Sequence, residues 1–131
     1  MLIHALKRGD KVVKTITNLL SVKGVKSGLV VGLGAFSNAT LMIYDLETKE
    51  YSSKIINEQA EVGSFTAVIG KDPEGNTHIH PHVVVSNKDF NTFAGHLKEA
   101  TVAATFEIVI FESDQEVDRY KDSEIGLNLI K

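Results

Sequence analysis

The 131-residue sequence contains no cysteine, which excludes disulfide frameworks, thiolate zinc fingers and cysteine nucleophiles. It also lacks a surplus of basic charge, because 14 Lys and Arg stand against 17 Asp and Glu, for a formal net charge of -3. A general nucleic-acid binder usually carries a basic surplus. The charge therefore disfavours nonspecific binding to phosphate backbones, although it leaves a local basic patch open.

Long apolar runs are missing as well. The longest, from Gly28 to Phe36, has about nine residues, whereas a membrane-spanning helix needs about 20. At the N-terminus the charges of Lys7 and Arg8 follow the apolar residues, which reverses the order of a secretory signal. We therefore expect a soluble, cytoplasmic protein without membrane contact. Its length suits a single domain, 1–131, that closes its core without disulfides or a metal staple.

One amphipathic helix is predicted between Asp10, as its N-cap, and Gly24, as its stop. Its apolar residues recur at helical spacing: Val12, Val13, Ile16, Leu19 and Leu20. This apolar stripe should pack against a sheet. A capping box at Ser113–Glu116 predicts a second, short helix that continues to Tyr120.

The rest of the chain has the pattern of strands joined by short polar turns. The predicted strands are Leu2–Leu6, Leu29–Phe36, Ala39–Tyr44, Glu50–Ile56, Ser64–Ile69, Thr77–Ser86, Thr101–Phe111 and, at an edge, Leu127–Ile130. The mixed polar segment Asn87–Leu97 is predicted as a loop. Together these elements indicate an α+β domain with a mostly antiparallel β-sheet, flanked by one longer and one short helix.

Histidine is the unusual residue of this chain, because three of its five histidines lie in the segment 78–82 (HIHPH). Side chains alternate along a strand, so these imidazoles would project from one face with neighbours about 6.6 Å apart. Two such rings can converge on one ion at metal–nitrogen distances near 2.1 Å. His96 is the natural third ligand, since Gly95 before it lets the chain bend toward the histidine strand. The alternative is a set of surface or hydrogen-bonded histidines without a ligand.

Two further residues bear on such a site. Pro81 has no N–H for a β-ladder, which predicts that the histidine strand lies at an edge or is bulged there. Glu107 lies within the apolar strand Thr101–Phe111. An inward carboxylate at Glu107 would need a partner, such as the ring N–H of a ligand histidine. The alternative is an outward Glu107 on a half-exposed strand.

Short motifs with a characteristic order extend over nearly the whole chain. They are Arg8-Gly9-Asp10, Gly32-Leu-Gly-Ala35, the Tyr44-Asp45 hairpin, Gly70 to Gly75, His80 to Ser86, Gly95-His96-Leu97 and Phe106 to Ile110. This order resembles the plants-and-prokaryotes conserved (PPC) domain, which also occurs in plant AT-hook proteins. The most specific part is the His-x-His motif followed by Gly-His-Leu at this separation. A more distant likeness is to acetolactate decarboxylase, a zinc enzyme with three histidine ligands.

The resemblance implies an antiparallel sheet flanked by helices, assembly as a homotrimer, and a histidine cluster that holds a divalent metal, zinc in first place. Alignment of the motifs makes His80, His82 and His96 the metal ligands and leaves His78 as an extra histidine. In this scheme Glu107 is the catalytic acid or base, or the hydrogen-bond partner of a ligand histidine.

The sequence departs from the family pattern at two positions. Ala94 precedes Gly95, where the family more often has two glycines, which makes this loop slightly stiffer. Pro81 stands between the two histidines of the first motif, where the family usually has Leu or a similar residue. Neither departure removes an imidazole.

Three functions remain open at this point. The first is a homotrimeric metalloprotein with enzyme-like potential and a small-molecule ligand. The second is a DNA-associated regulatory module, as in the plant relatives, but the chain has no Arg-Gly-Arg-Pro core of an AT-hook and no basic tail. We therefore expect its DNA binding to be weak or absent. The third is a structural trimer whose histidines bind no physiological metal.

Overall fold

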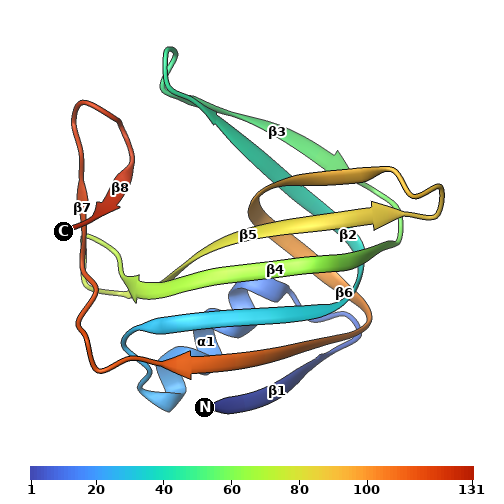
Figure 1. The fold of residues 1–131 in the computed structure, drawn as a ribbon, viewed down its shortest axis with the longest axis horizontal. Helices are drawn as coiled ribbons and strands as arrows, with labels where there is room; N and C mark the ends of the chain where they lie inside the picture. Colours follow the sequence, from blue (N-terminus) through green and yellow to red (C-terminus); the bar gives the residue numbers. More distant parts are fainter.

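The computed structural model describes residues 1–131 as one helix and eight strands (Figure 1). Along the chain they are β1 (Leu2–Lys7), α1 (Val12–Lys23), β2 (Gly28–Asp45), β3 (Glu50–Ile56), β4 (Ala60–Lys71), β5 (Thr77–Asn87), β6 (Thr92–Glu112), β7 (Arg119–Lys121) and β8 (Asn128–Ile130). All pairings between these strands are antiparallel. The mostly antiparallel sheet of the predicted α+β fold is thereby confirmed.

The two longest strands, β2 and β6, organise the main sheet. They pair along their length, from Gly28 opposite Glu112 to Met42 opposite His96, with register shifts between these ends. The β4–β5 hairpin pairs on one side with the first part of β2 and on the other side with the first part of β6. The two long strands therefore pair both with each other and with the β4–β5 hairpin. Strand β1 forms one edge of the sheet, and β3 forms the other.

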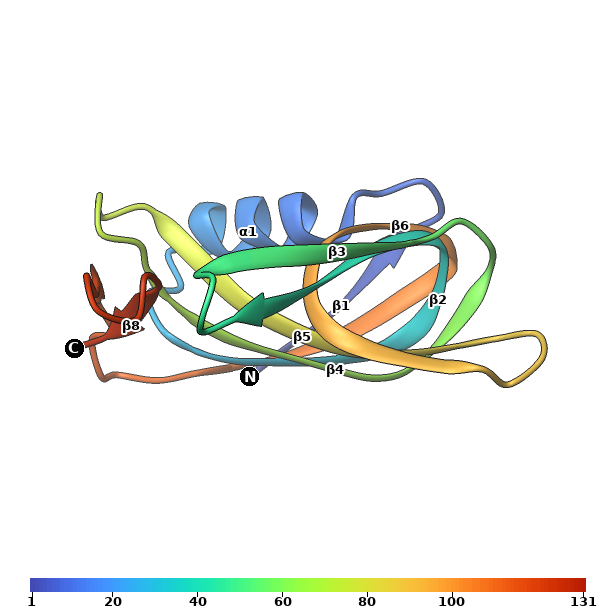
Figure 2. The ribbon, with the colours of Figure 1, turned by 90° about the horizontal axis from the view of Figure 1, so that it is seen from above.

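Helix α1 covers only one face of this sheet, and the opposite face carries no helix (Figure 2). The helix buries one stripe of side chains: Val12, Ile16 and Leu20. Beneath it, Phe106 contacts both Phe36 and Phe65, with ring centroids 5.1 and 5.2 Å apart. With 12 residues, α1 is too short to cross a membrane.

The sequence predicts the C-terminal end of α1 correctly and its N-terminal cap wrongly. The stop at Gly24 is confirmed, with a left-handed φ of 71° that a residue without Cβ adopts readily. The predicted cap by Asp10 is wrong, because its carboxylate accepts the Lys7 N–H at 2.9 Å instead. The first-turn N–H groups of Val13 and Lys14 donate to the carboxylate of Glu99 on β6, at 2.8 and 3.2 Å. A distant strand thus caps this helix.

Two predicted interruptions of the sheet are also wrong. Strand β2 runs without a break through Ser37 and Asn38, where register shifts occur in its pairing with β6. The segment Asn87–Leu97, predicted as a loop, is mostly strand, because β6 begins at Thr92. Its polar residues stay in the ladder since β5 pairs with them, which shows pairing overriding local composition.

The predicted second helix does not form. Ser113 begins a local turn, in which its hydroxyl accepts the Gln115 N–H at 3.1 Å. The Ser27 hydroxyl donates to the carbonyls of Ser113 and Gln115, and the Val117 carbonyl accepts the Lys71 N–H. These carbonyls are therefore committed to the rest of the fold and not to a helix. The chain continues into β7, and the predicted edge strand becomes β8, its partner in a small two-stranded sheet.

The edge predicted from Pro81 is confirmed. Strand β5 pairs with β6 only from His82 to Ser86, whereas Pro81 pairs with Ala67 of β4 on the other side. The first half of β5 is therefore free along one side. The missing N–H of Pro81 leaves no gap in a ladder.

Candidate metal centre

Two paired strands place three histidines on the open face of the sheet. His82 of β5 lies directly opposite His96 of β6, and His80 precedes His82 by two residues. Opposed residues and residues two apart share a face of the sheet. The alternating residues of β5, Ile79 before His80 and Pro81 before His82, are buried on the other face, toward the core. The alternation expected from the sequence thus aims all three imidazoles away from α1.

The three imidazoles are close enough to share one ion. Their ring centroids are separated by 5.0 Å (His80–His82), 5.2 Å (His80–His96) and 5.8 Å (His82–His96). One nitrogen from each ring lies within 4.8 Å of the others. A tetrahedral ion with bonds near 2.1 Å needs nitrogens about 3.4 Å apart, so the rings must move closer together to hold it. Three imidazoles are a donor set that suits zinc and other late first-row divalent metals.

The other two residues singled out in the sequence lie outside this group. His78 shares the face of His80 but pairs with Gly70 further along β5, and it is not part of the convergent set. Glu107 is exposed in the second part of β6, opposite Ala5 of β1 and Leu33 of β2. Glu107 is therefore not among the residues that converge at the cluster, and its catalytic role stays a prediction.

Burial disfavours the protonated form of two cluster histidines, His80 and His96. Burial, helped by the nearby charges of His96 and Arg119, lowers the pKa of His80 to about 4. Burial is also the main reason why the pKa of His96 lies below its usual value. The pKa of His78 is lowered by burial and by Arg119, against an opposing effect of Asp72. Since a metal binds the unprotonated ring nitrogen, His80 and His96 are poised as ligands at neutral pH.

The lowered pKa of His80 predicts an acid sensitivity of the metal-free protein. Between pH 6.5 and about 4 the unfolded chain binds a proton at this residue that the folded chain does not. Stability should therefore fall as the pH drops through this window. Urea unfolding at several pH values should show a smaller loss for His80→Asn than for the unmodified protein. Equal losses in the two proteins would show that His80 is not the source of the acid sensitivity.

A cleft of ≈ 360 Å³ adjoins two of the three histidines. Its lining combines the sheet with the C-terminal hairpin: Met42, Tyr51, His78, His80, His96, Arg119, Lys121, Gly126, Leu127, Asn128 and Leu129. The ring centroids of Tyr51 and His96 are 5.9 Å apart. His82 is exposed and lines a smaller neighbouring hollow of ≈ 160 Å³. A ligand held by the cluster would thus extend toward the C-terminal hairpin.

The sequence matches one known protein family. The sequence matches the model of the Plants and Prokaryotes Conserved (PCC) domain, also abbreviated PPC, over residues 1–114. The chain belongs to the PCC domain family. The resemblance drawn from the sequence motifs is therefore confirmed.

Several solved structures superpose closely on this chain. A protein from Ralstonia eutropha JMP134, provisionally described as DNA-binding, is 31% identical with a TM-score of 0.90, covering 98% of this chain and 89% of its own. One from Bacteroides thetaiotaomicron with a similar description is 29% identical with a TM-score of 0.94, covering 98% and 90%. A protein from Archaeoglobus fulgidus described as metal-containing is 29% identical with a TM-score of 0.91, covering 99% and 91%.

A more distant likeness concerns the fold alone. Alpha-acetolactate decarboxylase from Bacillus subtilis is 11% identical with a TM-score of 0.56, and the match covers 95% of this chain and 57% of the enzyme. No curated protein matches the sequence. The structural likeness to the decarboxylase anticipated from the sequence is nevertheless confirmed.

The C-terminal hairpin of this PCC domain lies beyond the residues that match the family model. The Tyr44 hydroxyl on β2 donates to the Ile125 carbonyl at 2.7 Å and ties the turn between β7 and β8 to the sheet. No spacing signal in the sequence connects the cleft residues Tyr51 and Arg119 with the histidine motifs. Only the folded chain brings these residues to the cluster.

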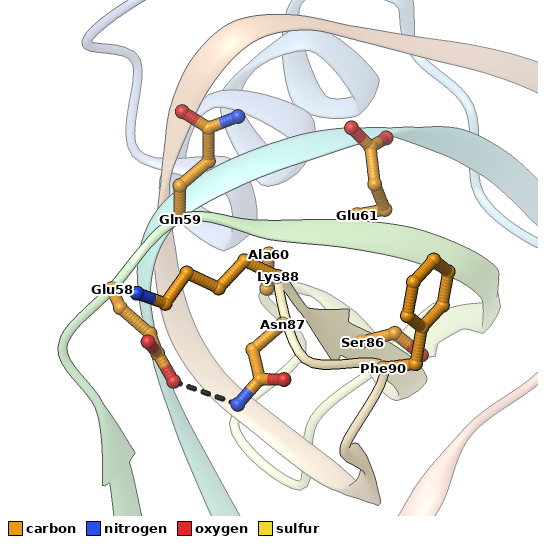
Figure 3. Close-up of a pocket in the computed structure, with 8 residues that line it drawn as sticks. All are labelled: Glu58, Gln59, Ala60, Glu61, Ser86, Asn87, Lys88 and Phe90. Carbon is orange, nitrogen blue, oxygen red and sulfur yellow. Dashed lines mark hydrogen bonds between the residues drawn. The ribbon is translucent and has the colours of Figure 1, made fainter.

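The largest cavity of the PCC domain lies elsewhere, and no comparable group of metal-ligating side chains lines it. Its volume is ≈ 580 Å³, and its lining comes from the β3–β4 and β5–β6 connections and the adjoining strand ends. Asn87 donates to Glu58 at 2.9 Å, whereas Glu61 and Phe90 point elsewhere (Figure 3). These side chains do not converge on one point. The histidine cluster is therefore the stronger candidate for function.

Proposed function

We propose that this PCC domain binds a divalent metal ion, zinc in first place, through His80, His82 and His96, and presents it to a small molecule in the adjoining cleft. The observation that carries the proposal is the set of three ring nitrogens within 4.8 Å of one another. Three protein ligands are typical of catalytic zinc sites and leave one position for water or a ligand. The relative from Archaeoglobus fulgidus, described as metal-containing, supports this function.

The chain supplies the setting for such chemistry. A bound divalent ion polarises a carbonyl or activates a water molecule. The half-buried His80 and His96 hold their nitrogens in the form that binds metal, because burial keeps them unprotonated at neutral pH. Met42 and Tyr51 line the cleft that adjoins the cluster.

Thermal unfolding with added zinc tests this function. A ligand that binds only the folded state raises its stability by mass action, so zinc should raise the unfolding temperature of protein purified without a histidine tag. The rise should disappear when His80 and His82 are both replaced by alanine. It should persist in His4→Ala, which removes an exposed histidine on β1. A rise of equal size in the double variant would refute the assignment.

We also propose that the chain assembles as a homotrimer through the open face of the main sheet. Large apolar side chains of β1, β2 and β6 are exposed there: Ile3 is 71% exposed, Leu33 58% and Phe111 44%. The strand register connects this surface with the metal cluster. One row of directly paired residues crosses the sheet on this face, in the order Ile3, Val109, Val31, Thr66 and His82. The number three comes from the family resemblance. This arrangement would bring the cluster close to a subunit boundary.

The trimer predicts a measurable mass. Light scattering at micromolar concentration should give about 43 kDa, three times the 14.3 kDa of one chain. Leu33→Glu should dissociate the assembly, because it inserts a charge into the apolar surface. Val22→Glu is the matched control, since Val22 is 85% exposed on α1, on the other side of the sheet. A stable monomer of the unmodified protein would rule out the proposed assembly.

DNA binding is the second candidate function, favoured by the descriptions of the relatives from Ralstonia eutropha and Bacteroides thetaiotaomicron. The net charge of -3 offers few phosphate contacts. We therefore expect any retention on DNA to be weak, nonspecific and lost between roughly 50 and 200 mM salt. Filter binding or electrophoretic mobility shifts at both salt concentrations measure this. Sequence-selective binding that survives the higher salt would make DNA the primary partner.

A further inference from the structure

Arg119, the first residue of β7, is a buried cation beside the histidine cluster. It is only 7% exposed, and it lines the same cleft as His80 and His96. The chain has one other arginine, Arg8, which is exposed in the turn before α1. Arg119 therefore brings a fixed positive charge to the interior of the cleft.

Few protein groups satisfy the guanidinium of Arg119. One of its terminal nitrogens, Nη1, donates to the Asn128 carbonyl at 3.1 Å, and this is its single hydrogen bond to the protein. Nε is buried without a partner. A guanidinium has five N–H donors, and a buried charge is costly unless it is paired and hydrogen-bonded.

The surroundings of Arg119 provide no counter-charge for it. Burial alone lowers the pKa of Arg119, with no opposing contribution from a carboxylate. None of the other residues that line the cleft beside Arg119 carries a carboxylate. A divalent ion at the cluster would add further positive charge. The cleft as a whole therefore favours an anion.

On the basis of the proposed metal site, we propose that the cleft binds a small carboxylate, whose oxygens accept hydrogen bonds from the terminal nitrogens of Arg119. The opposite end of such a molecule faces His80 and His96. The volume of ≈ 360 Å³ lies at the lower end for small-molecule pockets. Met42, Leu127 and Leu129 supply apolar lining for a short carbon skeleton.

The donors of the cleft favour a carboxylate over a phosphate group. One guanidinium matches the two oxygens of one carboxylate. Phosphate sites usually add further cations or the N–H groups of a helix N-terminus. Lys121 is the one other permanently cationic residue of the cleft, and its Nζ already donates to the Gly126 carbonyl at 3.0 Å. No helix lines this cleft.

The position of Arg119 separates ligand recognition from metal binding. The three histidines lie within the residues that match the family model, 1–114, whereas Arg119 belongs to the hairpin beyond them. The hairpin therefore determines which molecule meets a metal held by the sheet. Replacement of Arg119 should alter ligand binding and leave the metal affinity intact.

Calorimetric titration of the zinc-loaded protein tests the proposal, with pyruvate as the probe. Pyruvamide serves as a neutral analogue of nearly the same shape, and inorganic phosphate as the competing anion. We expect pyruvate to bind at least about tenfold more tightly than pyruvamide, because only the carboxylate pairs with the buried charge. Equal binding of pyruvate and pyruvamide, no binding of pyruvate, or tighter binding of phosphate would overturn the proposal.

The variant Arg119→Gln should weaken pyruvate binding at least about tenfold and leave zinc affinity unchanged. Arg8→Gln is the matched control and should behave like the unmodified protein. If the glutamine variant does not fold, Arg119→Lys keeps the charge without the planar fork and should still weaken pyruvate binding. Unchanged pyruvate affinity in a folded Arg119 variant overturns the proposal. If the unmodified protein does not bind zinc, the metal site on which the carboxylate proposal rests is refuted instead.

Discussion

Replacing any one of His80, His82 and His96 by alanine will lower zinc affinity at least about 100-fold, whereas His78→Ala will have a much smaller effect. The reason is geometric, because a site with three ligands loses its chelate arrangement when one ligand is removed. His78 lies on the same face but outside the set of nitrogens within 4.8 Å of one another. Competition titrations against a chelating dye, at pH 7 and on all four variants, measure the effect.

The same titrations discriminate between three arrangements. If His78→Ala is as damaging as the other replacements, the site is shifted by two residues along β5. If none of the four variants changes the affinity, the histidine site does not exist and the structural-trimer hypothesis takes its place. Only a large loss confined to His80, His82 and His96 agrees with the proposed centre. His4→Ala controls for the general loss of an imidazole.

Gly34→Ala should destabilise the fold by about 3–5 kcal/mol. Gly34 lies in β2 beside a register shift, with a φ of 150° that side-chain-bearing residues rarely adopt. A Cβ there would overlap the Thr105 carbonyl oxygen and lie 2.8 Å from the Phe106 backbone. Both obstacles are backbone atoms of β6, so rotation of a side chain cannot relieve the clash. Urea unfolding gives the difference in stability.

Gly63→Ala is the matched control for this effect. Gly63 lies in β4 at another register shift, but its φ is not positive and the nearest atom to an added Cβ is the Val84 carbonyl oxygen at 3.9 Å. We therefore expect a change below about 1 kcal/mol. Similar losses in the two variants would show that the close approach of β2 and β6 at Gly34 does not determine stability.

The sequence predicts most of the elements because their signals are local. Helical spacing followed by Gly24 predicts α1 and its end, and Pro81 predicts the free edge of β5. The convergence of His80 and His82 follows from the alternation of a strand. The addition of His96 follows from the family motifs, and the pairing of β5 with β6 places it opposite His82.

The rest depends on contacts between distant parts of the chain. Glu99 caps α1 from across the sheet, which no local capping pattern indicates. The capping box at Ser113–Glu116 predicts a helix, but bonds to Ser27 and Lys71 hold this segment in another conformation. For the same reason no local pattern predicts Arg119 as a cleft residue, since it reaches the cleft only through the hairpin that replaces the predicted helix.

Metal analysis of protein purified without a histidine tag tests the central claim most directly. After dialysis against zinc and removal of free metal, elemental analysis should find one zinc ion per chain. The double variant His80→Ala, His82→Ala should contain almost none. Absence of bound zinc in the unmodified protein, or an equal content in the double variant, would contradict the account.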